Sequence, residues 1–267
     1  MIESRATRIG LKVWTLLVVL FLHLPIVIII LYAFNAQTAQ GWPITEWTTK
    51  WFSPTLHDEE MRQALWLSLK AAVGATVIAL VLGSLAAFAI HRFKFFGRDM
   101  ISFVFILPIA LPGIITGMAL NSFFVFWHVN FGIWTIIVGH ATFCVVIIFN
   151  NVIARLRRTP TSLVEASMDL GADGWQTFRY VTLPTISTAL VSGALLAFAL
   201  SFDEVIVTTF TAGVQNTLPI WIFGNIRIGQ QLPEVNVVVF LILIGTILPV
   251  TIAQRLTSES GILRTRR

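Results

Sequence analysis

Charged side chains are scarce in this chain. Asp, Glu, Lys and Arg make up 12% of its 267 residues, whereas hydrophobic residues make up 56%, and this balance does not describe a soluble globule. Runs of about 20 apolar residues recur instead, and each can cross a hydrocarbon core of about 30 Å as a helix. The composition therefore predicts an all-α, polytopic membrane protein.

Residues that could carry chemistry are also missing. The single cysteine, Cys144, lies in an apolar run, so an internal disulfide is excluded and we interpret it as a packing residue. No lysine follows a glycine, so the Gly-Lys step of a phosphate-binding loop is absent. No His, Cys and carboxylate cluster has metal-ligand spacing, and no triad stands out. We therefore expect no catalytic, cofactor or metal residues, and any nucleotide energy must come from another chain.

The apolar runs divide into six predicted spans, at about 13–34, 64–90, 100–127, 133–153, 186–211 and 235–253. The first follows basic residues, as in a signal peptide, but it exceeds the usual apolar core of about 7–15 residues and no clear cleavage site follows. We interpret it as an uncleaved span. In the third, Pro108 and Pro112 remove helix hydrogen bonds, which predicts a bend or local unwinding. Gly113 and Gly117 have the spacing of a small-residue packing face.

Basic residues gather at the ends of the predicted spans and mostly on one side. An even number of spans places both termini on the same side of the membrane, and that side holds most of the Lys and Arg residues. The positive-inside rule therefore predicts cytoplasmic termini and a cytoplasmic loop at residues 155–185. A net charge of +5 arranged in this way favours a lipid bilayer, and not nucleic acid, as the partner.

This cytoplasmic loop has the local signals of short helices joined by a bend. Ser162 and Glu165 have the spacing of a capping box at the start of a helix, and Gly171 suits the left-handed residue that ends one. Asp173 is placed to cap a second helix, and Pro184 to open a third. The run therefore predicts a small, partly apolar surface held outside the lipid, suited to docking.

The same residues resemble the EAA loop of ABC-importer permeases. That pattern is Glu-Ala-Ala, three residues, Gly, nine residues, Ile, one residue, Leu-Pro, and this chain keeps every spacing with Ser for the second Ala and Val for Ile. The matching residues are Glu165, Ala166, Ser167, Gly171, Val181, Leu183 and Pro184. In that family the loop is the coupling helix that docks in a groove of the cytoplasmic ATPase. Taken alone, Glu165 also fits an ordinary helix cap.

Over nearly its full length the chain resembles the spermidine/putrescine branch of these permeases, in particular the smaller of the two permeases. The segments that carry the resemblance are Leu107-Pro108, Leu111-Pro112-Gly113, Gly139-His140-Ala141-Thr142-Phe143, Arg155 with Arg157, Ser201-Phe202-Asp203-Glu204 and Pro233-Glu234-Val235-Asn236. The resemblance implies a type I ABC importer permease (MetI-like) fold with six transmembrane helices in a bacterial inner membrane. It also implies a heterodimer with a second permease, two ATPase subunits that bind ATP and Mg²⁺, and an extracytoplasmic solute-binding protein.

Charged residues inside predicted spans are the best pointers to a translocation path, because each costs about 2.5–3.5 kcal/mol at the centre of a membrane helix. Asp203 and Glu204 lie in the fifth span, and Lys70 lies at a similar depth in the second. Neighbouring helix positions point about 100° apart, so we expect one acid to line the path and the other to pair, with Lys70 or with the partner permease. Pro112 is a further candidate for the path. A structural ion pair is the alternative, and we interpret His140 as a packed, hydrogen-bonded histidine, not a titrating one.

The sequence therefore predicts the permease subunit of an ATP-driven importer, which forms a path for polyamines such as putrescine and spermidine. The same architecture carrying another solute, such as another amine-containing metabolite or an iron or thiamine compound, is one alternative. A secondary transporter is a second, although no convincing internal repeat supports it. A structural or sensory membrane subunit is a third.

Overall fold

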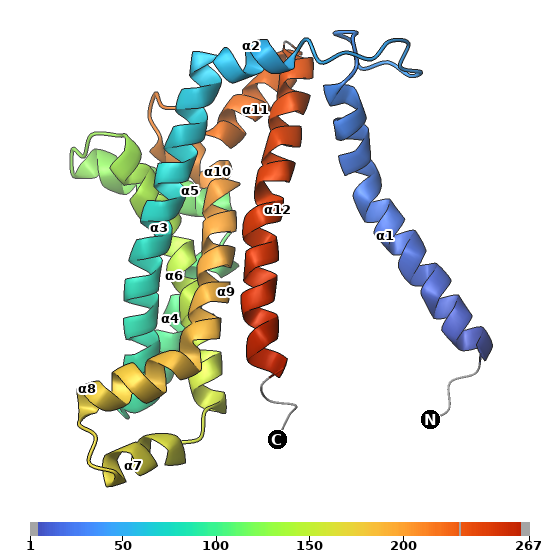
Figure 1. The fold of residues 1–267 in the computed structure, drawn as a ribbon. Helices are drawn as coiled ribbons and strands as arrows, with labels where there is room; N and C mark the ends of the chain where they lie inside the picture. Colours follow the sequence, from blue (N-terminus) through green and yellow to red (C-terminus); the bar gives the residue numbers. More distant parts are fainter. Residues whose placement is uncertain (1–4, 230, 263–267) are drawn as a thin grey trace. The chain divides into compact units, whose positions relative to one another are not determined.

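The chain is built from helices joined by turns and loops, of which the connection at residues 34–51 is long (Figure 1). The computed structural model describes residues 5–229 and 231–262, and within them the only strand-like pairing is an isolated bridge between Asn35 and Trp47. The elements are α1 (Arg5–Ala33), α2 (Phe52–His57), α3 (Glu59–Arg92), α4 (Arg98–Ala110), α5 (Gly113–Phe126), α6 (Ile133–Arg158), α7 (Ser162–Asp169), α8 (Gly174–Thr177), η1 (Phe178–Thr182), α9 (Leu183–Phe202), α10 (Ile206–Thr211), α11 (Leu218–Ile228) and α12 (Leu232–Ile262). The predicted all-α class is confirmed.

Four helical segments of the described chain are long and apolar enough to cross a membrane, judged by length and composition. They are Arg5–Ala33, Glu59–Arg92, Ile133–Arg158 and Gly174–Phe202. Shorter apolar helices cover Gly113–Phe126, Leu218–Ile228 and Leu232–Ile247. The number of six spans therefore stays a prediction.

The chain divides into two compact units, of which one contains residues up to 61 together with 222–249. In this unit three phenylalanine rings meet, with centroids 5.2 to 5.8 Å apart: Phe34 after α1, Phe52 in α2 and Phe240 in α12. The indole N–H of Trp51 donates to the carbonyl of Asn35 at 2.8 Å. Aromatic packing and this bond hold the end of α1 against the start of α2.

The other unit contains residues 62–221 and those from 250 onward, and α6 lies at its centre. Small residues of the neighbouring helices pack on α6. A Cβ added to Gly83 of α3 would meet the Val145 carbonyl oxygen at 2.7 Å, and one on Gly193 of α9 would lie 3.1 Å from Ile148. Helices in membranes associate through such close contacts, since burial from water no longer drives them together. The sequence thus places its glycines where α3 and α9 touch α6.

Two helices of this unit are interrupted. The third predicted span breaks at Leu111 and Pro112, between α4 and α5, as expected from a residue without a backbone N–H. Leu111 is extended (φ −81°, ψ 141°), as residues before proline usually are. The fifth predicted span also breaks, at residues 203–205 between α9 and α10, although it contains no proline there. The prediction of one continuous helix over 186–211 is therefore wrong.

The loop after α6 follows part of its predicted local structure. Gly171 has φ +86°, and the Asp173 carboxylate accepts the Gln176 amide at 2.7 Å while the Gln176 side chain accepts the Asp173 amide. The predicted capping box between Ser162 and Glu165 is absent, because helical geometry starts one residue earlier at Thr161 and moves Ser162 into the first turn. The local signals thus identified the bend and the second helix correctly.

The second helix of the loop runs into α9 without a stop. One turn of π-helix, η1, joins them, and the Leu183 amide bonds to the carbonyl five residues back, on Phe178. Pro184 sits in the next position and has no N–H to offer the Tyr180 carbonyl, so an ordinary helical bond is lost there. The prediction that Pro184 opens a separate helix is therefore wrong. Pro184 instead widens one turn of a continuous helical run from Gly174 to Phe202.

Candidate functional site: an exposed loop and two broken helices

The loop between α6 and α9, residues 159–184, presents apolar side chains to its surroundings. Leu170 is 89% exposed and Trp175 is 65% exposed, and Leu163 and Met168 of α7 are exposed as well. Glu165 and Ala166 lie on the same short helix and are also exposed, whereas Ser167 is half-buried. Several exposed apolar side chains on one short segment are typical of a protein interaction site.

Contacts behind this surface fix it to the helices. The hydroxyls of Ser167 and Thr177 are hydrogen-bonded at 3.1 Å, and the Phe178 ring packs edge-on against Phe88 of α3 with centroids 5.7 Å apart. The Arg155 guanidinium of α6 donates to the Thr185 carbonyl at 2.9 Å. The loop is therefore attached to both α3 and α6, so a displacement of its surface is transmitted to these helices.

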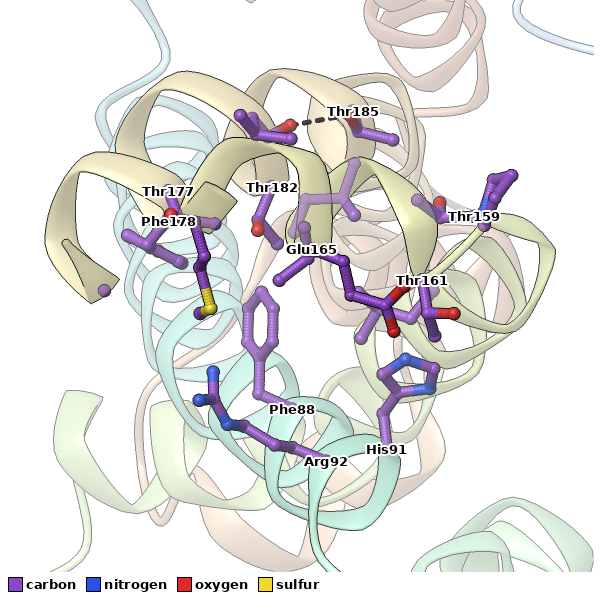
Figure 2. A pocket seen from close by; sticks show the side chains of 17 residues that line it. Phe88, His91, Arg92, Thr159, Thr161, Glu165, Thr177, Phe178, Thr182 and Thr185 are labelled. Atoms are coloured by element: carbon purple, nitrogen blue, oxygen red, sulfur yellow. Dashed lines mark hydrogen bonds between the residues drawn. The ribbon is translucent and has the colours of Figure 1, made fainter. Parts of the chain in front are cut away.

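A cavity of about 360 Å³ lies beneath α7 (Figure 2). Glu165 projects into it from α7, opposite Phe88, His91 and Arg92 at the end of α3. His91 lies at the end of α3, one residue beyond the predicted span 64–90. Arg92 lines the same cavity as Glu165, so a cation and a carboxylate face it from two different helices.

Leu183 and Pro184, the last two residues of the predicted coupling set, lie in the first turn of α9 and are exposed. With Gly171 at the bend, all six predicted coupling residues belong to the loop or to its junction with α9. The six residues thus lie on α7, at the bend that follows it and in the first turn of α9, and their role in coupling stays a prediction.

The two helix breaks lie side by side. α5 and α10 are the segments that follow the breaks, and they pack on one another. A Cβ added to Gly113, the first residue of α5, would lie 3.6 Å from Ile206, the first residue of α10, and one on Gly117 would lie 2.6 Å from the Phe210 ring. The Asn121 amide donates to the Phe210 carbonyl at 2.7 Å. The predicted small-residue packing face is therefore present, and its partner is α10.

The two predicted acids have different environments at this break. Glu204 is half-buried, and its Oε1 accepts the Val207 amide at 2.9 Å, so it caps α10. Asp203 follows the last residue of α9 and is exposed. Lys70 is exposed on α3, and in residues 5–229 and 231–262 no ion pair joins it to either acid. Pro112, also exposed, lies at the neighbouring break.

His140 of α6 is packed and hydrogen-bonded, as interpreted from the sequence. It is 1% exposed, with Nδ1 at 2.7 Å from the Ser201 hydroxyl and Nε2 at 2.8 Å from the Thr208 hydroxyl. Ser201 and Thr208 were not predicted from the sequence as its partners. The signal that could have identified them is their position, since Ser201 and Thr208 flank the acidic pair Asp203 and Glu204 within an apolar run.

A second hollow, of about 450 Å³, lies between α6 and α9 on the side of Arg155. It is lined by Asn150, Asn151, Ala154, Arg155, Arg158, Thr188, Ala189 and Ser192. These polar side chains belong to two helices that are long and apolar enough to span a membrane. Asn150, Asn151 and Ser192 lie within the predicted spans 133–153 and 186–211, where lipid tails cannot satisfy them, so this face suits contact with protein or water.

Comparison with known proteins gives consistent matches. Residues 79–258 match the family described as binding-protein-dependent transport system inner membrane component. The chain is 36% identical over 243 residues to the putrescine transport system permease protein PotI of Escherichia coli (strain K12), covering 86% of this chain and 85% of PotI. It is 30% identical over 240 residues to the spermidine/putrescine transport system permease protein PotC of the same strain, covering 90% of each.

A solved structure shares the fold. A chain of a bacterial ABC transporter involved in the import of the acidic polysaccharide alginate superimposes with a TM-score of 0.69, covering 97% of this chain and 99% of that one. Sequence identity is 17%, so the likeness concerns the fold alone. The predicted fold of ABC importer permeases is therefore confirmed.

Proposed function

Since the chain belongs to the family of binding-protein-dependent transport system inner membrane components, we propose that it forms part of the path through which an ATP-driven importer carries polyamines such as putrescine and spermidine. The observation that carries the proposal is the identity with the putrescine permease PotI over most of both chains. An exposed carboxylate at a helix break, Asp203, agrees with a cationic solute. The chain is not itself an enzyme in this proposal.

In the proposed mechanism the loop couples the chain to an ATPase. The exposed apolar residues of α7 form the docking surface, the Glu165 carboxylate lines the cavity beneath it, and Gly171 sets the bend between α7 and α8. Because α8, η1 and α9 are one helical run, a displacement of the loop tilts α9 and the break at its other end. ATP and Mg²⁺ are held by two partner ATPase subunits, and this chain transmits the movement.

Asp203 is the residue proposed to meet the solute. A carboxylate in a membrane helix is costly in lipid, so an exposed one belongs in a water-filled path. There it attracts an ammonium group and raises the local concentration of the cation. Pro112 contributes through the adjacent break, and Glu204 acts as the cap of α10 that keeps the break in place. Lys70 remains a candidate to face the path or the partner permease.

A second permease chain is the proposed partner at the polar hollow between α6 and α9, in a heterodimer. The hollow is lined by polar side chains, and lipid is a poor cover for Asn150 and Asn151, which lie within the predicted span 133–153. An extracytoplasmic solute-binding protein delivers the solute from the opposite side. The complex lies in a bacterial inner membrane with both termini of this chain in the cytoplasm, in agreement with the distribution of Lys and Arg.

Uptake of radiolabelled putrescine and spermidine tests the proposal. Cells that lack this chain are compared with cells that express it together with its partner subunits. Uptake that depends on the chain and is competed by unlabelled polyamine is the expected result. If the chain supports uptake of a different solute and not of polyamines, the proposed substrate is wrong. If polyamine uptake is equal with and without the chain, the proposed function is overturned.

A further inference from the structure

His140 joins the two sides of the break that carries Asp203. It projects from the middle of α6 and bonds to Ser201 in the last turn of α9 and to Thr208 in the first turn of α10. All three residues are buried, with exposed fractions of 2% or less. One side chain from a third helix thus spans the interruption at residues 203–205.

The hydrogen-bond network assigns the protons. The Thr208 hydroxyl donates to the Glu204 carbonyl at 2.7 Å, so its oxygen accepts the bond from His140. Nε2 of His140 is therefore the protonated nitrogen, and Nδ1 of the neutral ring accepts from the Ser201 hydroxyl at 2.7 Å. Every polar atom of the ring has a partner, which a histidine this deep in an apolar segment requires.

The far end of α10 is held without His140. The Thr135 hydroxyl of α6 donates to the Thr211 carbonyl at 2.7 Å, and Asn121 of α5 holds the Phe210 carbonyl. α9 is held on α6 by close packing and by the Cys144 thiol, which donates to the Ala197 carbonyl at 3.3 Å. The short link between the two segments has local bonds of its own: the Asp203 amide donates to the Ala199 carbonyl at 3.1 Å, and the Val205 carbonyl accepts the Thr209 amide at 2.9 Å. His140 adds bonds that tie both sides of this link to α6.

We propose that His140 is a positioning residue that fixes the conformation of residues 203–205 and thereby holds the Asp203 carboxylate in the path. This role rests on the proposed function of Asp203 as the residue that meets the cationic solute. Both hydrogen bonds contribute, because each attaches one side of the break to α6. Loss of both leaves the link held by local bonds alone, namely those of Asp203 and Val205 with neighbouring turns and the Glu204 cap, so the Asp203 carboxylate samples more positions.

Three substitutions separate the two hydrogen bonds. The Asn side-chain oxygen reproduces the position of the Nδ1 acceptor, and the Gln side-chain amide reproduces the position of the Nε2 donor. His140→Asn therefore keeps the bond to Ser201, His140→Gln keeps the bond to Thr208, and His140→Ala removes both. Ser201→Ala and Thr208→Val remove the same bonds from the other side.

The first measurement does not involve transport. A nitroxide is attached to Asp203→Cys in a Cys144→Ser background, in the purified full-length chain in nanodiscs, and its mobility is read from the EPR line shape. We expect higher mobility at residue 203 with His140→Ala and an intermediate value with His140→Gln or His140→Asn. The matched control is the same label at Leu170→Cys, which is exposed on the loop between α7 and α8 and should not change.

The second measurement is putrescine uptake by His140 variants that retain Asp203. We expect His140→Ala to raise KM roughly 5- to 10-fold with a smaller effect on the maximal rate, and His140→Gln to recover part of the loss. Unchanged mobility at residue 203 in all three variants, or an equal increase at residue 170, would overturn the positioning role. Increased mobility at residue 203 together with normal uptake by Asp203→Asn would instead overturn the proposed path through Asp203.

Discussion

The Glu204 carboxylate accepts a hydrogen bond from the Val207 amide at 2.9 Å, and this contact separates the roles of two adjacent acids. Glu204 is satisfied by the first turn of α10, whereas Asp203 is exposed at the end of α9. Two carboxylates that are neighbours in sequence thus differ because a helix break lies at their position. One carboxylate is bonded to the backbone of α10, and the other is exposed.

We expect Asp203→Asn to impair polyamine uptake more than Glu204→Gln does. The Asn substitution removes the charge that attracts an ammonium group, and a lost charged hydrogen bond of about 1.5 kcal/mol corresponds to roughly a tenfold rise in KM. Gln at position 204 retains an oxygen that can accept the Val207 amide. Uptake kinetics at matched protein levels measure both effects, and a larger defect for Glu204→Gln would reverse the assignment.

The cap role of Glu204 has its own test. Glu204→Ala removes the acceptor of the Val207 amide and should lower the free energy of unfolding by about 1 kcal/mol, as the loss of a helix cap does. Glu204→Gln should lower it less. Thermal unfolding in detergent, followed by circular dichroism, compares the two variants, and equal stability of Glu204→Ala and the unmodified chain would contradict the cap.

Coupling through the loop should depend on Glu165 and Gly171. Glu165→Ala removes the carboxylate that points into the cavity beneath α7, and Gly171→Pro cannot adopt φ +86° because the proline ring holds φ near −65°. Both variants are expected to insert in the membrane normally and to lose uptake.

Gly174→Ala is the matched control for these substitutions. Gly174 lies in the same loop, has ordinary backbone angles and has open space around its Cβ position, so it should retain uptake. Normal uptake by both Glu165→Ala and Gly171→Pro would show that the loop does not couple this chain to an energy source. Loss of uptake in Gly174→Ala as well would mean that the loop tolerates no change, whatever its role.

The contact between α5 and α10 offers a pair of glycines with different surroundings. A Cβ at Gly117 would lie 2.6 Å from the Phe210 ring, so Gly117→Ala forces this ring or its helix to move and should cost about 1–3 kcal/mol of stability. At Gly113 the nearest Ile206 atoms would be 3.6 Å away, an ordinary contact, and Gly113→Ala should be tolerated. Melting temperatures of the two variants measure the difference, and equal values would contradict the packing of these two segments.

The features that the sequence predicted correctly depend on local chemistry. The break at Pro112 follows from a missing N–H, the left-handed Gly171 from the absence of a Cβ, and the Asp173 cap from a neighbour three residues away. The Ser162 cap failed by one residue, which is a common error at helix ends. Predictions of this kind need only a few adjacent residues.

The break at residues 203–205 could not be predicted in this way. It contains neither proline nor glycine, and the hydrogen bonds that flank it come partly from far away in sequence. His140 lies 61 residues from Ser201 and 68 residues from Thr208. Tertiary contacts therefore override an apolar pattern that is typical of an uninterrupted helix, and only the structure reveals which acid is left exposed.

The π-helical turn before α9 leads to a test in which stability and function change in opposite directions. Pro184→Ala supplies the missing N–H, so residue 184 can bond to the Tyr180 carbonyl and the widened turn can become ordinary α-helix. Proline within a helix costs about 3 kcal/mol relative to alanine, so the variant should unfold at a higher temperature. Polyamine uptake by this variant should nevertheless fall. When the π-helical turn becomes α-helical, its extra residue joins the regular helix, and the loop rotates by about 100° relative to α9.

Pro160→Ala is the matched control, because Pro160 precedes α7 and lies outside any helix. It should change neither the melting temperature nor uptake appreciably. Disulfide cross-linking between cysteines placed on α7 and on the ATPase would report whether the loop of Pro184→Ala still docks. A stabilised Pro184→Ala chain with full uptake would show that the loop orientation set by η1 is not required for coupling. Movement would then not reach Asp203 through a rigid connection between the loop and the broken helix.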